Sequence, residues 1–136
     1  MISLGTIRLP RQWSVYQARN KIRGLAGALG FDEINTTRLA TAVSEAARML
    51  RTGQGDPRIS VFLAMDASPP QLVLDFHCHG QMRLECLTGF FDCMHDTDSP
   101  GGGHTVRGVR WLPRPVIVAS VSFIEEQRHL IQKPSL

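Results

Sequence analysis

Two groups of residues in this sequence could support chemistry. The run Gly101-Gly102-Gly103-His104-Thr105-Val106-Arg107-Gly108 could hold phosphate oxygens through its backbone amides, aided by the Arg107 guanidinium. A second set offers metal-ligand side chains, namely His77, His79, Cys93 and His95. Because no spacing in this set matches a known zinc pattern, hydrogen-bonding histidines and buried cysteines are the alternative interpretation.

A third candidate is Glu45, which lies on a predicted amphipathic helix running through residues 37–55. At helical spacing, the polar side of this helix carries Thr41, Glu45, Arg48 and Met49. Met49 follows Glu45 by one turn, at a place where a solvated helix usually carries a polar residue. The opposite side forms an apolar stripe of Leu39, Val43, Ala46, Ala47 and Leu50.

The segment Ser44-Glu45-Ala46-Ala47-Arg48-Met49 resembles the first ATP-site motif of the GHKL ATPase superfamily. The likeness is to its small bacterial switch serine kinases and anti-sigma factors, whose helix reads Ser-Glu-x-x-Arg-Asn. This resemblance implies that Glu45 is the general base of a serine/threonine protein kinase, if the protein is active. Met49 stands where the family has its Mg²⁺-binding asparagine, so no metal is expected there.

Two later segments are similar to further motifs of the same family. The segment Asp75-Phe76-His77-Cys78-His79-Gly80 resembles Asp-x-Gly-x-Gly, which implies that Asp75 takes the adenine amino group. His77 and His79 replace both glycines and should obstruct the adenine. The glycine-rich run resembles the family's phosphate loop, which assigns phosphate binding to Gly101, Gly103, Thr105, Arg107 and Gly108.

The resemblance implies a bacterial partner-switching signalling protein that acts mainly by protein binding. Its expected partner is a regulator protein: an antagonist-type domain, a sigma factor or a phosphatase. ATP and Mg²⁺ binding should be weak or lost, as in a pseudokinase. The alternative is an active kinase that phosphorylates an antagonist-type regulator domain from a rearranged Mg-ATP site. A homodimer is a further expectation.

Length, charge and cysteine usage set wider bounds. The 136 residues suit one domain, spanning 1–136, and the formal charge of +3 comes from scattered arginines, which does not favour nucleic acid binding. The three cysteines lack a Cys-x-x-Cys spacing, and the N-terminal residues lack the pattern of a secretory signal. No apolar run approaches the ~20 residues of a membrane span. A cytoplasmic protein with free thiols is therefore expected.

Hydrophobic periodicity predicts the elements that must position these residues. The predicted fold is α+β, a two-layer sandwich in which a mostly antiparallel, mixed sheet has helices packed on one face, as in GHKL domains. The expected elements are an edge strand at 5–10, helices at 14–30 and 32–53, strands at 58–65 and 71–78, a broken helix or lid at 82–94, a loop at 96–103, a helix at 105–112, and strands at 116–123 and 129–132.

Overall fold

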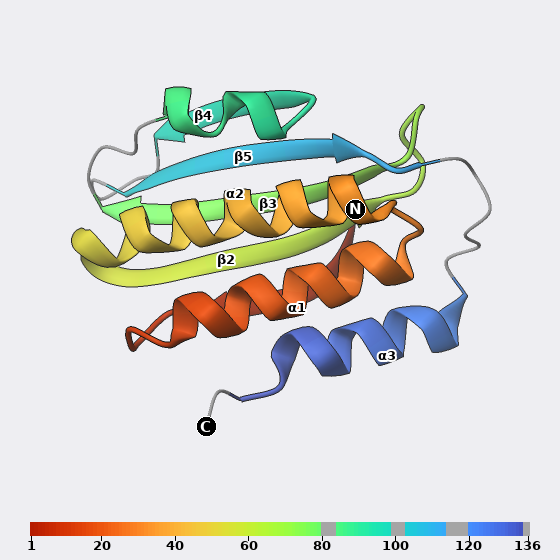
Figure 1. Cartoon of the computed structure of the whole chain (residues 1–136), viewed down its shortest axis with the longest axis horizontal. Helices are drawn as coiled ribbons and strands as arrows, with labels where there is room; N and C mark the ends of the chain where they lie inside the picture. Colours follow the sequence, from red (N-terminus) through yellow and green to blue (C-terminus); the bar gives the residue numbers. More distant parts are fainter. Residues whose placement is uncertain (80–83, 99–102, 114–119, 135–136) are drawn as a thin grey trace.

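The protein folds into two layers, as predicted: a five-stranded antiparallel sheet with the helices on one of its faces (Figure 1). The computed structural model describes residues 1–79, 84–98, 103–113 and 120–134. The strand order is β1-β2-β3-β5-β4, and every neighbouring pair is antiparallel. The elements are β1 (Ile2–Arg8), α1 (Ser14–Ala28), α2 (Glu33–Thr52), β2 (Gln54–Ala64), β3 (Gln71–His79), β4 (Cys93–Asp98), β5 (His104–Trp111) and α3 (Val121–Gln132).

The first two helices form where the sequence predicts them. The side chain of Asp32 caps α2 by accepting a hydrogen bond from the backbone N–H of Asn35 at 2.8 Å, which satisfies one free donor of the first turn. The predicted apolar stripe of α2 is buried, with Leu39, Val43 and Leu50 at most 2% exposed. Helix α1 packs beside α2 and buries Ala18, Ile22, Leu25 and Ala26.

Strand alternation decides which face of the sheet meets the helices. Along β3, Leu72, Leu74 and Phe76 are fully buried and belong to the same cluster as the apolar stripe of α2. The intervening residues, including Asp75 and His77, must point to the opposite face, because successive strand residues alternate. Burying each large apolar side chain in this cluster contributes roughly 1.5–3 kcal/mol, so the two layers hold one another together.

The segment after β3 departs from the predicted elements. Residues 84–90 form two short 3₁₀ turns, Leu84–Cys86 and Thr88–Phe90, followed by β4. The predicted loop at 96–103 was wrong for 96–98, which belong to β4, while 99–102 lie outside the described residues. The predicted helix at 105–112 was also wrong, because that segment is β5 and pairs with both β3 and β4.

The C-terminal segment was predicted as strands, and its described part is helical. Residues 114–119 are not described, and α3 begins after Ser120, whose hydroxyl accepts a hydrogen bond from the backbone N–H of Phe123. Ile124 and Ile131, two turns apart, join the core cluster. The cap and this helical spacing explain why 121–132 is a helix and not the end of one strand and a second strand.

Helix α3 packs against the first strand at the sheet edge and beside α1. Arg128 and Gln132 donate hydrogen bonds to the backbone oxygens of Ser3 and Leu4, at 2.8 and 3.4 Å. From α1, the Lys21 ammonium donates to the backbone oxygen of Ile131 at 2.9 Å. Burial, together with a neighbouring lysine, lowers the pKa of Lys21.

None of the described helices is both long enough and apolar enough to cross a bilayer.

Candidate functional site

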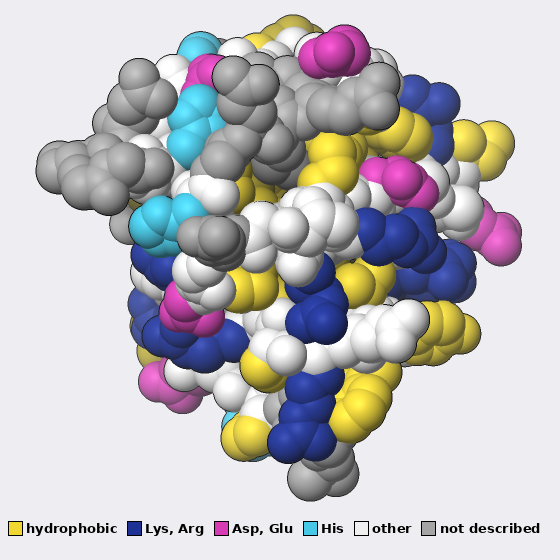
Figure 2. Space-filling model, turned by 90° about the vertical axis from the view of Figure 1, so that its left-hand side faces the viewer, with side chains coloured by type: hydrophobic (Ala, Val, Ile, Leu, Met, Phe, Trp, Pro, Cys, Tyr) yellow, Lys and Arg dark blue, Asp and Glu magenta, His cyan; other side chains and the backbone are white. Residues whose placement is uncertain are grey.

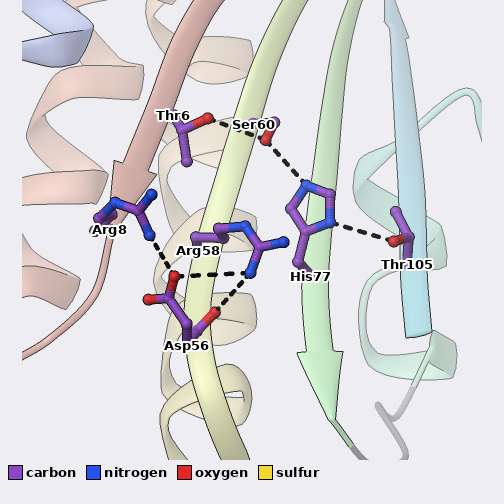
Figure 3. A network of polar contacts seen from close by, with 7 residues as sticks. All are labelled: Thr6, Arg8, Asp56, Arg58, Ser60, His77 and Thr105. Atoms are coloured by element: carbon purple, nitrogen blue, oxygen red, sulfur yellow. Dashed lines mark hydrogen bonds and ion pairs between the residues drawn. The ribbon is translucent and has the colours of Figure 1, made fainter. Parts of the chain in front are cut away.

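The most connected polar site in the described structure lies on the sheet face away from the helices (Figure 3). It forms because four neighbouring strands place small polar and charged side chains in register. Asp75 on β3 lies between Ser60 on β2 and Arg107 on β5, and His77 lies between Arg58 and Thr105 on the same two strands. Cross-strand neighbours of this kind are close enough for direct contact.

His77 is the centre of a chain of hydrogen bonds that crosses the sheet. One ring nitrogen lies 2.9 Å from the Ser60 hydroxyl, and the other lies 3.2 Å from the Thr105 hydroxyl. Ser60 in turn contacts the Thr6 hydroxyl at 3.2 Å. Burial and the Arg58 guanidinium lower the pKa of His77, although Asp75 partly opposes this effect. The lowered pKa favours the neutral imidazole, in which one nitrogen donates and the other accepts.

Asp75 and Arg107 form a two-pronged ion pair on the same face. The guanidinium donates from Nε to one carboxylate oxygen at 2.7 Å and from Nη2 to the other at 2.9 Å. The Asp75 side chain is only 8% exposed, whereas the Arg107 side chain is 38% exposed. The hydrogen bond to Asp75 raises the pKa of Arg107, which keeps the guanidinium charged. Both Asp75 oxygens are thus engaged within the protein.

A second charged group continues the network at the start of β2. The Asp56 carboxylate accepts from Arg8 on β1 and lies 3.8 Å from the Arg58 guanidinium. Arg58 also donates to the backbone oxygen of Asp56 at 3.1 Å. Since the side chains of Arg8 and Asp56 are more than half exposed, this group contributes less to stability than the buried Asp75 carboxylate does.

A small cavity of about 150 Å³ opens beside His77. Its walls present nitrogen donors and one thiol, and burial raises the pKa of that thiol, Cys78. The cavity is lined by Arg58, His77, Cys78, His79, Gly103, His104 and Thr105.

The structure also gives the positions of the residues that the sequence analysis named as candidate metal ligands. Across the described ranges, no group of three or more His, Cys, Asp or Glu side chains is arranged to hold a metal ion. Cys93 and His95 lie two residues apart on β4, with 3.7 Å between Sγ and Nε2. His77 lies on β3 and is bonded to hydroxyl groups.

The structure does not bring the candidate base and the candidate adenine ligand together. Glu45 is exposed on α2, where its carboxylate accepts from Arg48 at 2.8 Å. Met49 is half-buried and packs against the core cluster. Helix α2 covers one face of the sheet, while Asp75 belongs to the other face and is bonded to Arg107. The sheet therefore separates Glu45 from Asp75.

Of the five candidate phosphate-binding residues, four are described, and they lie just before β5 or within it. Gly101 lies outside the described residues, and Gly103 lines the small cavity. Thr105 and Arg107 point to the open face from β5 and bond to His77 and Asp75. Gly108 serves packing instead, because a Cβ there would lie 2.8 Å from the Phe91 ring. Among the described members, Gly103 and Thr105 line one cavity, and Arg107 shares the sheet face of Thr105.

Sequence reasoning overlooked five members of the network, namely Thr6, Arg8, Asp56, Arg58 and Ser60. The available signal was the alternation in β2, where Arg58 and Ser60 flank the fully buried Ile59 and so must share the face opposite the core. Which side chains of the neighbouring strands contact Arg58 and Ser60 could not be predicted without the strand register. Comparison with models of known protein families and with curated proteins gives no match for this chain.

Proposed function

We propose that this chain is a regulatory domain of the partner-switching kind, which acts by binding another protein and does not use ATP. The observation that carries this proposal is the Asp75–Arg107 pair, in which the group that would hold adenine and a group that would hold phosphate neutralise each other. Breaking this pair to admit a nucleotide would leave a nearly buried carboxylate without its counterion.

The requirements of phosphoryl transfer support the same proposal. Catalysis of this reaction depends on holding the base, the phosphates and the metal in one site, so that the transition-state charge is stabilised. Here Glu45 and Asp75 belong to opposite sides of the sheet, and the half-buried Met49 offers a soft sulfur to a hard cation.

Protein binding is supported by the exposed surface. Large apolar side chains that are 46–74% exposed occur on or next to α1, α2, α3 and β5, and two of them, Trp13 and Tyr16, line one groove. They include Trp13, Tyr16, Ile34, Trp111, Val121 and Leu130. The partner that the resemblance implies is an antagonist-type domain, a sigma factor or a phosphatase.

The claim that the chain does not use ATP is tested by measuring its thermal unfolding with millimolar Mg-ATP. We expect no increase in Tm, because binding to the folded state would have to raise it. A Tm increase that Asp75→Asn removes would overturn the proposal. Transfer of radiolabelled phosphate to an antagonist-type domain would do the same if Glu45→Ala abolished it. Glu33→Ala, on the same helix and equally acidic, is the matched control.

The protein-binding part is tested by mixing the chain with each antagonist-type domain, sigma factor and phosphatase of its source cell. We expect one of them to co-elute with it in size-exclusion chromatography without nucleotide. If no member of these classes forms a complex, or if the complex forms only with ATP, the proposal fails.

A further inference from the structure

A wide groove lies between the N-terminal end of α1 and the C-terminal end of α2, with a volume of about 720 Å³. This end of the molecule is the left-hand end in Figure 1 and faces the viewer in Figure 2, where Lys and Arg side chains alternate with hydrophobic ones. The groove is lined by Gln12, Trp13, Val15, Tyr16, Arg48, Arg51 and Thr52.

Two aromatic side chains dominate one wall. Trp13 is 48% exposed and Tyr16 is 63% exposed, one helical turn further along α1. Val15 between them is buried and connects the wall to the core. Exposed, rigid rings supported by a packed floor are typical of the anchor sites of protein interfaces, because they bury a large area at low entropic cost.

The arginines of this groove are already held in position. Arg51 donates to the backbone oxygen of Leu9 at 2.8 Å, and Arg48 is paired with Glu45. Arg11 and Arg19 lie over the rings of Trp13 and Tyr16, with 5.1 and 5.9 Å between the guanidinium carbon and the ring centroid. A guanidinium carries five N–H donors, so each of these groups keeps donors for a further carboxylate.

We propose that this groove binds an acidic segment of a partner protein, whose apolar residue packs on Trp13 and Tyr16 while its carboxylates pair with the arginines. The inference rests on the proposed protein-binding function and names the chemistry of the partner. Arg48 and Arg51 line the groove, Arg11 and Arg19 lie over its two rings, and no acidic residue is among the described lining residues. The charge complementarity therefore favours an acidic ligand.

The same features disfavour a single-stranded nucleic acid. A phosphate backbone needs a track of cations, whereas the two arginines that line this groove, Arg48 and Arg51, lie on one turn of α2.

The experiment uses the fluorescence of Trp13 in a Trp111→Phe background. Trp111 pairs with Gln71, the first residue of β3. The groove lies near the other end of β3, because the backbone oxygen of His79 lies beside the C-terminal end of α2. The substitution therefore leaves the groove intact and makes Trp13 the single tryptophan of the chain. The probes are a short peptide of Asp and Glu around a central Leu, the same peptide with Asn and Gln, and an oligothymidylate.

We expect the acidic peptide to change the Trp13 emission saturably and in a salt-dependent way. Tyr16→Ala and Arg48→Ala should each weaken its binding by about tenfold, the effect typical of an interface anchor. Arg23→Ala removes an exposed arginine of the same helix that does not line the groove, so it should leave binding unchanged. Circular dichroism of each variant shows whether the fold is retained.

Three results would overturn the inference. These are equal binding of the amidated peptide, tighter binding of the oligothymidylate, and an acidic-peptide affinity that neither groove substitution reduces. If the groove variants still bind the partner found by size-exclusion chromatography with unchanged affinity, the inference fails while the proposed function stands. Absence of any partner complex, with peptide binding intact, would instead contradict the proposed function alone.

Discussion

The ion pair between Asp75 and Arg107 should be asymmetric, because its two members differ in burial. The Asp75 side chain is 8% exposed and accepts both guanidinium hydrogen bonds, while the Arg107 side chain is 38% exposed and can turn toward water. Arg107→Met strands a buried carboxylate and should cost about 2–4 kcal/mol of unfolding free energy. Asp75→Asn keeps an acceptor and leaves a hydratable cation, so it should cost about 1–2 kcal/mol.

The assay is urea unfolding at neutral pH of both single variants and of the double variant. Because an amide can be buried without a counterion, the double variant should be more stable than the sum of the single losses predicts, by about 1–3 kcal/mol. Arg8→Met is the control, since it breaks an ion pair whose side chains are both more than half exposed and should cost less than about 1 kcal/mol. Equal losses for the two single variants, or strict additivity, would refute the reasoning.

Three further predictions concern packing, pH and capping. Gly108→Ala should destabilise the protein by about 1–3 kcal/mol in urea unfolding, because the new methyl meets the Phe91 ring, and by less when Phe91→Leu is already present. Since the folded-state pKa of His77 is lowered, the unfolded chain binds the extra proton below about pH 6.5; wild-type stability should therefore fall with acidification more steeply than that of His77→Gln. Asp32→Ala removes the acceptor of the Asn35 N–H and should cost about 1 kcal/mol in the same assay.

Each of these predictions has a contradicting outcome. An alanine at 108 that is tolerated equally well in both backgrounds would mean that Phe91 does not limit the space. If the unfolding free energies of wild type and His77→Gln change in parallel between neutral and mildly acidic pH, His77 does not contribute to the pH dependence of stability. Unchanged unfolding of Asp32→Ala would mean that water or another side chain replaces the cap.

The sequence predicted the parts of the fold in which local pattern and tertiary packing agree. Helices α1 and α2 and strands β2 and β3 follow from apolar periodicity and from the Asp32 cap, and all four were confirmed. The edge strand was also confirmed, although β1 ends at Arg8 and starts earlier than predicted. Periodicity is reliable for these elements because each buries one whole face.

The remaining elements failed for identifiable reasons. Residues 105–112 were predicted to form a helix, although Thr105, Val106 and Val109 are β-branched and the segment pairs with two strands. The strand predicted at 116–123 continued past Ser120, which is the N-cap of α3. A serine before an apolar helical pattern is a local signal, so this cap could have been recognised from the sequence. The pairing of Asp75 with Arg107 depends on strand register, which sequence spacing alone does not give.

The contacts between β1 and α3 join segments that are more than a hundred residues apart, through Arg128 to Ser3 and Gln132 to Leu4. During synthesis, β1 therefore leaves the ribosome long before α3, the helix that covers it. Leu4 and Ile7 belong to the same core cluster as Ile124 and Ile131, so this cluster is incomplete until α3 has been made. Long-range closure of this kind slows folding. Until α3 packs against β1, the nascent chain exposes an apolar strand at the edge of its sheet, and exposed edge strands promote aggregation. Chaperones would therefore matter most before α3 has packed.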